Sequence, residues 1–161
     1  MKTEITKNKM TYDGVKALEE ELDHLKVVSR KEIAQKIKEA REQGDLSENA
    51  EYDAALEEQR EIEARIEEID KILKNVVVID PTDSAHDNSI GIGCVVTIYD
   101  EEFEEEVEYK IVGSKEAKIE ENKISDESPV GKALIGKKEG DEVLVETNSG
   151  ELKFKVLSIK R

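Results

Sequence analysis

The chain has 161 residues, of which 40 are acidic and 25 are basic, so its formal net charge at pH 7 is -15. This excess of negative charge disfavours a stand-alone DNA- or RNA-binding protein, because binding to a phosphate backbone needs a surplus of Lys and Arg. With 37% hydrophobic and 4% aromatic residues, the chain can form one ordinary domain or two small ones, but no large single core.

No segment of the sequence is suited to a membrane or to disulfide chemistry. The first ten residues carry four charged side chains and no apolar run, so we expect no signal peptide. The longest uncharged run, 88–99, is too short to span a bilayer. Cys94 is the only cysteine, which excludes an internal disulfide, and we expect it to be buried. The sequence predicts a cytoplasmic protein with no membrane partner.

The composition changes abruptly near Asp80 and Pro81. Residues up to Lys74 contain no proline and only two glycines, and they are rich in the helix formers Glu, Lys, Ala and Leu. Beyond the change come both prolines, seven glycines and runs of Val and Ile. We therefore predict an α+β protein with a helical domain over 1–78 and a strand-rich domain over 79–161.

The first predicted helix is capped by Thr11 and ends at Gly44. Its apolar residues follow one face at three- and four-residue spacing: Val15, Leu18, Leu22 and Leu25. The same spacing resumes after a gap of eight with Ile33, Ile37 and Ala40. That gap shifts the heptad phase by one residue, so we expect the helix to continue with local unwinding.

A second helix is predicted after a short connection, with its apolar face formed by Tyr52, Leu56, Ile62, Ile66, Ile69 and Leu73. Two helices with narrow apolar stripes and a tight connection predict a long antiparallel coiled-coil hairpin. Its first helix spans 12–43, which is about 48 Å at 1.5 Å per residue.

The second half predicts a small antiparallel sheet with one short helix. After a strand or strap at 76–79, we expect strands at 93–99, 103–112, 142–147 and 152–159. Residues 100–102 and 148–150 supply turns. The helix is expected over 130–135, with Ser128 as its cap, Pro129 at its first position and Gly136 at its end.

The connection between the two long helices concentrates negative charge. Residues 42–58 contain seven carboxylates and no Lys or Arg, whereas 26–41 hold a local surplus of four positive charges. An acidic tip is thus expected on a basic shaft. Within the tip, Asp45 and Glu48 are three residues apart at a helix start, which brings two carboxylates to one exposed end.

Two interpretations of this pair remain open. Carboxylates suit a hard cation such as Mg²⁺, which takes one or two of them and fills its other positions with water and phosphate oxygens. Alternatively, Asp45 is an N-cap and Glu48 completes a capping box. Two carboxylates cannot enclose a hydrolytic metal alone, so on the first interpretation the tip is half of an active site.

Two motifs carry a resemblance to a known family. The nine residues GDLSENAEY over 44–52 and SPVGKALIG over 128–136 closely resemble those of bacterial transcript-cleavage factors of the Gre family, and the similarity covers nearly the whole chain. It implies an FKBP-like C-terminal domain that binds RNA polymerase, and a coiled coil that enters the polymerase secondary channel. The tip would then help the polymerase to cleave its own backtracked nascent RNA, with Mg²⁺ shared in the complex and no cofactor bound tightly by the factor.

The resemblance also implies roles for individual residues. Asp45 and Glu48 correspond to the catalytic tip carboxylates that hold the shared Mg²⁺. Arg41 corresponds to a basic position that faces the RNA, and Asn49 and Tyr52 belong to the same tip motif. The residues Ser128 and Pro129 correspond to the polymerase-docking loop.

Three other functions compete with transcript cleavage. A protein of the same shape can occupy the secondary channel as an inhibitor without a cleavage role. An FKBP-like prolyl isomerase needs aromatic pocket walls, whereas only Tyr99, Phe103, Tyr109 and Phe154 follow residue 80. A hairpin chaperone should expose apolar residues at its tip, and this tip exposes charge. We therefore expect a cofactor protein for the polymerase rather than an enzyme in its own right.

Overall fold

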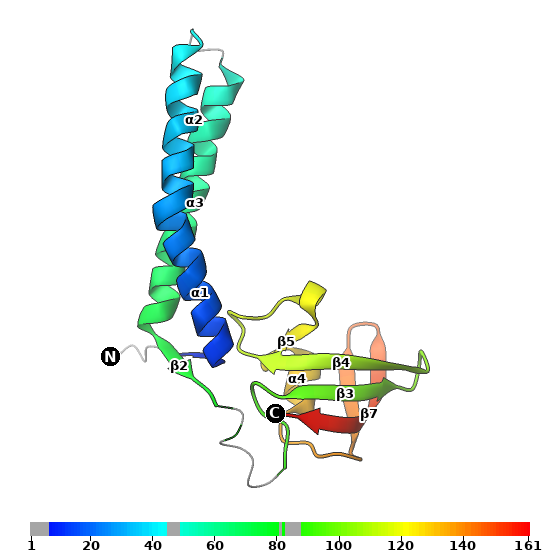
Figure 1. Ribbon diagram of the computed structural model, residues 1–161. Coiled ribbons are helices and arrows are strands. Elements are labelled where there is room, and N and C mark those ends of the chain that lie inside the picture. Colours follow the sequence, from blue (N-terminus) through cyan, green and yellow to red (C-terminus); the bar gives the residue numbers. More distant parts are fainter. Residues whose placement is uncertain (1–6, 45–48, 81, 83–87) are drawn as a thin grey trace, which may run out of the picture. The chain divides into compact units, whose positions relative to one another are not determined.

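The computed structural model describes residues 7–44, 49–80, 82 and 88–161 (Figure 1). Two compact units form: Lys16–Lys74 is one, and the segment up to Val15 together with Asn75–Arg161 is the other. The first is helical and the second contains the sheets, so the predicted α+β class is confirmed. The predicted domain boundary between residues 78 and 79 stays a prediction. No helix in the described ranges is long and apolar enough to cross a membrane.

Two long helical segments of the first unit pack side by side and antiparallel (Figure 1). One consists of α1 (Tyr12–His24), η1 (Leu25–Ser29) and α2 (Arg30–Glu42), and the other is α3 (Ala50–Lys74). Ion pairs join the two segments, including Lys26 with Asp70, Arg30 with Glu63 and Lys36 with Glu58. The residue numbers rise along one segment as they fall along the other, as antiparallel packing requires.

The apolar stripes meet between α2 and α3. The buried residues Ile33, Ile37 and Ala55 form a cluster, against which the half-buried Tyr52, Leu56 and Ile62 pack. The prediction for the end of α3 was wrong by one position, because Ile72 is 4% exposed whereas Leu73 is only half-buried. Both lie within one turn of Ile69, so helical spacing alone does not choose between them.

The expected unwinding of the first helix is observed as a π-helical turn. In η1 the backbone N–H of Arg30 donates to the carbonyl oxygen of Leu25, five residues earlier, instead of four. A π-turn accommodates one extra residue, which is the size of the phase slip in the sequence. Val27 is 61% exposed and no residue of η1 is buried. The turn therefore restores the alignment of the two stripes without adding to the core.

A five-stranded sheet forms the second unit, in the order β5-β4-β3-β7-β6. The strands are β3 (Val95–Asp100), β4 (Glu105–Val112), β5 (Lys123–Ser125), β6 (Glu142–Thr147) and β7 (Gly150–Lys160). The pairs of β3 with β4, β3 with β7 and β6 with β7 are antiparallel, as predicted. The turn residues Asn148 and Ser149 join β6 to β7.

The prediction of a purely antiparallel sheet was wrong, because β5 pairs with β4 in parallel. The chain between them contains the 3-10 helix η3 (Ile119–Glu121), and this connection is long enough to return the chain to a parallel direction. A second parallel pair joins β1 (Asn8–Met10) to β2 (Val76–Val78). The strand β2 was expected, but β1 and β5 have only three residues each and leave little periodic signal.

The core of this unit lies between the sheet and α4 (Pro129–Leu134). It is formed by buried residues of β3, β4, β6, β7 and α4 and of the segment before β3: Ile90, Cys94, Val96, Ile98, Ile111, Leu134, Val143, Val145, Phe154 and Val156. The expected burial of Cys94 is confirmed.

Thr11 caps α1, as predicted. Its hydroxyl oxygen accepts a hydrogen bond from the N–H of Gly14 at 3.1 Å. The carboxylate of Glu116 in turn accepts from the Thr11 N–H at 3.0 Å and from the Thr11 hydroxyl at 2.8 Å. The cap is thus itself held by a side chain that is distant in sequence.

Deletion of Val27 tests the role of the π-turn. Removing one residue here brings the two stripes back to continuous seven-residue spacing, so we expect the free energy of unfolding to stay at or above the wild-type value. Deletion of Lys38 in α2 is the control, because it rotates the buried Ala40 by about 100° relative to Ile33 and Ile37, so that the three can no longer face α3 together. That control should lose about 2 kcal/mol or more. Equal losses in the two deletions, measured by denaturant unfolding, would contradict the phase-slip explanation.

Candidate functional site

The first long helical segment ends as the sequence predicts. The helix α2 stops at Glu42, the N–H of Gln43 donates to the carbonyl oxygen of Ala40 at 3.4 Å, and Gly44 follows with a φ of 117°. This left-handed conformation favours glycine, and it turns the chain out of the helix.

Asn49 connects the two helix ends at the tip. Its side-chain oxygen accepts from the N–H of Tyr52 at 3.1 Å, and its own carbonyl oxygen accepts from the N–H of Asp53 at 3.2 Å, so Asn49 is the N-cap of α3. Its side-chain NH₂ donates to the carbonyl oxygen of Ala40, near the end of α2, at 2.7 Å. One amide group therefore contacts both helices: it accepts from a free N–H of α3 and is a second donor to the Ala40 carbonyl of α2.

Arg41 lies over the ring of Tyr52. Its guanidinium carbon is 5.8 Å from the ring centroid, which is within the range of a cation–π contact. Arg41 is exposed and Tyr52 is half-buried against the cluster of Ile33, Ile37 and Ala55. The stacking holds the positive charge of Arg41 beside the tip, where residues 42–58 contain no Lys or Arg.

The carboxylates Asp45 and Glu48 lie outside the described residues, so their roles stay predictions. The N-cap of α3 is Asn49, however, and this corrects the capping-box interpretation, which gave that position to Asp45. Among the residues that the structure describes, no group of three or more His, Cys, Asp or Glu side chains could hold a metal ion.

The basic shaft is partly neutralised. Arg30 forms a bidentate pair with Glu63 at 2.8 and 2.9 Å, and this hydrogen bonding lowers the pKa of the Glu63 carboxyl. Lys36 binds Glu58 at 3.0 Å and Lys26 lies 3.8 Å from Asp70. The remaining basic residues of 26–41, which form no ion pair with another described residue, are Lys31, Lys38 and Arg41. Three of the six positive charges are thus used between the helices.

A further bidentate pair lies farther from the tip. The guanidinium of Arg65 donates to Glu21 at 2.7 and 3.0 Å and to Glu68 at 3.1 Å. These hydrogen bonds raise the pKa of Arg65. The pair links α1 to α3, so charge pairing between the two helical segments extends beyond α2.

The segment around Ser128 and Pro129 is a tightly bonded loop that leads into α4. The Ser128 hydroxyl donates to the carbonyl oxygen of Ser125 at 2.7 Å and accepts from the N–H of Gly131 at 3.1 Å, so it is the predicted cap. A Cβ atom on Gly131 would overlap the backbone carbonyl of Ser125. Pro129 is exposed at the first position of the helix. The loop therefore presents a rigid, exposed turn.

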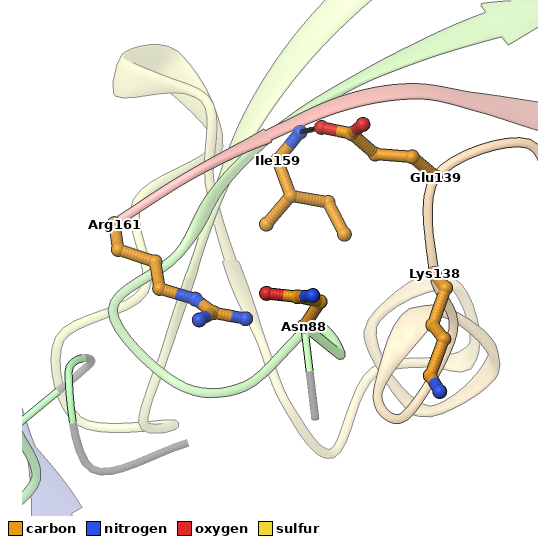
Figure 2. A pocket seen from close by; sticks show the side chains of 5 residues that line it. All are labelled: Asn88, Lys138, Glu139, Ile159 and Arg161. Carbon is orange, nitrogen blue, oxygen red and sulfur yellow. Dashed lines mark hydrogen bonds between the residues drawn. The ribbon is translucent and has the colours of Figure 1, made fainter. Parts of the chain in front are cut away.

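Two of the hollows that described residues line in the second unit differ in character. One, of about 520 Å³, lies beside this loop, with an apolar floor that includes Ile92 and Ile135 and charged residues that include Asp126 and Lys132. The other is polar, and Figure 2 shows Glu139 reaching the backbone of β7, where its carboxylate accepts from the N–H of Ile159 at 3.0 Å. None of the predicted site residues lines either hollow.

Comparison with known proteins identifies the family. A family model described as the N-terminal domain of a transcription elongation factor matches residues 8–78, and one described as the C-terminal domain of transcription elongation factor GreA/GreB matches 85–161. The chain belongs to the GreA/GreB family of transcription elongation factors. The resemblance to the Gre family is therefore confirmed, and the protein is a transcription elongation factor of this family.

Similar members of the GreA/GreB family carry the name GreA. The transcription elongation factor GreA of Lachnoclostridium phytofermentans is 61% identical over 157 residues, which are 96% of each chain. That of Thermoanaerobacter pseudethanolicus is 57% identical over 94% of this chain and 96% of its own. A crystal structure of GreA factor homolog 1 from Thermus thermophilus is 31% identical, with a TM-score of 0.42 over 97% of this chain and 100% of its own.

In this GreA/GreB family member, the structure brings three of the predicted tip residues together. Arg41, Asn49 and Tyr52 meet through the contacts given above, while Ser128 and Pro129 lie in the other unit. Sequence reasoning missed the carbonyl of Ala40 as a partner, because a backbone acceptor has no residue signature. It also missed Gly131, for which a glycine inside a short helix was the available signal.

Substitution of Tyr52 tests how its ring supports the tip. We expect Tyr52→Phe to change the free energy of unfolding by less than about 0.5 kcal/mol, because the ring keeps its place under Arg41. Tyr52→Ala should lose about 2 kcal/mol, since it removes a half-buried ring from the cluster at Ile37 and Ala55. Denaturant unfolding followed by circular dichroism measures both, and a neutral Tyr52→Ala would show that the ring does not support the tip.

Gly131→Ala tests the packing of the Ser128 loop. The new methyl group must displace the Ser125 carbonyl, so we expect a loss of about 1–3 kcal/mol in the free energy of unfolding. Lys132→Ala is the matched control, because Lys132 is the exposed neighbour in the same helix and should be nearly neutral. If thermal and denaturant unfolding do not separate the two variants, the loop is less constrained than its contacts indicate.

Proposed function

We propose that this protein is a transcript-cleavage factor for RNA polymerase. Its C-terminal domain, 79–161, is FKBP-like and docks on the polymerase through Ser128 and Pro129. Its N-terminal domain, 1–78, is a coiled-coil hairpin that enters the secondary channel and brings the acidic tip to the catalytic centre. There it stimulates the polymerase to cleave backtracked nascent RNA. We place this action in the cytoplasm, and the contact with nucleic acid is made through the polymerase.

The observation that carries the proposal is the closed end of the paired helices. Asn49 joins the last turn of α2 to the first turn of α3, and the acidic segment lies between these two helix ends in sequence. A capped helix needs no two-helix arm, whereas a group that must reach a recessed catalytic centre does. Three of the ion pairs between the two helical segments, one from η1 and two from α2, support a rigid arm.

The tip residues are proposed to act as follows. Asp45 and Glu48 supply carboxylate oxygens, which fit a hard cation, and Mg²⁺ bound in the complex would activate water for hydrolysis. Because two carboxylates leave most coordination positions to other ligands, the ion is shared with the polymerase, and the factor alone binds no cofactor tightly. Arg41, held over Tyr52, faces the RNA with its positive charge. The factor completes the active site of the polymerase and is not an enzyme by itself.

A channel-binding inhibitor without cleavage activity is the alternative that the same shape allows. The isomerase alternative is less well supported, because Phe154 is 6% exposed in the core and Phe103 is 67% exposed on a turn, so these rings do not together wall an apolar pocket. The chaperone alternative needs apolar residues at the tip, and the described residues 41–44 and 49–53 carry charged or polar side chains at most positions.

Replacing the tip carboxylates separates cleavage from inhibition. In stalled polymerase complexes, we expect the Asp45→Asn, Glu48→Gln double variant to bind normally and to lose RNA cleavage, because amides are poor ligands for a hard cation. Its melting temperature should stay at the wild-type value, because neither residue is the cap of α3. Without polymerase, neither form should hydrolyse RNA. Full cleavage by the double variant, or no stimulation by the wild-type factor, would overturn the proposed function.

A further inference from the structure

The side chain of Asn49 does more than cap a helix. An N-cap needs only an acceptor, which the Asn49 oxygen provides to the N–H of Tyr52 at 3.1 Å. Its NH₂ group additionally donates to the carbonyl of Ala40, at the short distance of 2.7 Å. The carbonyl belongs to the last turn of α2, where its backbone donor is the N–H of Gln43 at the longer distance of 3.4 Å.

This contact is placed where the arm has few other restraints. The ion pair nearest to the tip among the described residues joins Lys36 to Glu58, about one helical turn before Ala40. Beyond it, residues 41–44 are exposed, and a Cβ atom on Gly44 would meet nothing within 4 Å. Among the described residues, the Arg41–Tyr52 stacking and the Asn49 amide are the polar contacts given between α2 and α3 at this end, beside the apolar packing of Ala40 and Tyr52.

We propose that Asn49 is a positioning residue for transcript cleavage, because its amide bridges the Ala40 carbonyl of α2 and the Tyr52 N–H of α3. This inference rests on the proposed function. The acidic segment 45–48 lies in sequence between the two bridged ends, so the bridge limits how far these ends can separate. Side chains that bind a metal ion are oriented by hydrogen bonds from neighbouring groups. Loss of such a neighbouring group typically reduces metal affinity or activity about 10- to 100-fold.

Two substitutions isolate the bridge from the cap. Asp and Ser cap helices about as well as Asn, but neither can donate from an amide nitrogen to Ala40. The Asn49→Asp variant adds a negative charge and Asn49→Ser does not, so a loss shared by both is not an effect of charge. We expect both to bind polymerase within about twofold of wild type and to cleave backtracked RNA about tenfold more slowly at saturating factor. Half-maximal cleavage should also need more Mg²⁺.

Ile66→Val in α3 is the stability control, because it shortens a buried side chain far from the tip. It should leave the cleavage rate and the Mg²⁺ dependence unchanged at saturating factor. The positioning role is overturned if Asn49→Ser and Asn49→Asp cleave at the wild-type rate, if saturating factor restores them fully, or if Ile66→Val is equally slow. The Asp45→Asn, Glu48→Gln double variant is the reference: if it still cleaves, the proposed function has failed, whereas if only the Asn49 variants still cleave, the positioning inference alone has failed.

Discussion

The packing of α2 against α3 is the interaction on which the described features of the tip depend. The apolar contact is narrow, since Ile33, Ile37 and Ala55 are the buried residues of its cluster. Two single helices with so little apolar surface would be marginal in water, because most helical stability in proteins comes from packing of an apolar face. The pairs Arg30 with Glu63 and Lys36 with Glu58 flank this strip, and their aliphatic stems extend the covered surface.

The same ion pairs explain how a chain with a net charge of -15 can form a long, thin element. Positive charge is concentrated on α2 and negative charge on α3. The two helices therefore attract one another where they meet, instead of repelling each other as two acidic helices would. Towards the tip this compensation ends, and a hydrogen-bonded amide and a stacked guanidinium take its place. At this end the carboxylates of Glu42, Glu51 and Asp53 form no ion pair with another described residue.

Periodicity predicted much of this architecture, and contacts that lack periodicity were missed. The eight-residue gap between Leu25 and Ile33 predicted the site of the π-turn, because a phase slip must be absorbed somewhere along a packed helix. The Ser128-Pro129 pair predicted the cap and the first position of α4, although the expected range of 130–135 lies one residue later than the observed Pro129–Leu134. By contrast, β1 and β5 were too short to alternate, and the parallel pairing of β5 depends on the whole connection after β4 rather than on β5 itself.

In the candidate site, too, the residues could be predicted from the sequence but their contacts could not. The resemblance to the Gre family identified Asn49 and Tyr52 as parts of the tip, but it gave them no partners. The partner of Asn49 is a backbone carbonyl on the preceding helix, and that of Tyr52 is a cation at a distance in sequence. Such contacts depend on how two helix ends approach one another, which a single sequence read along its length does not specify.

The parallel pairing of β1 with β2 has a consequence for the order of folding. These strands lie on opposite sides of the whole helical unit in sequence, so their direct meeting would require closure of a very long loop. Local helix formation and antiparallel packing shorten that search, because they bring the segments before α1 and after α3 to the same end of the helix pair. We therefore expect β1 and β2 to pair late in folding, after the helices between them have assembled.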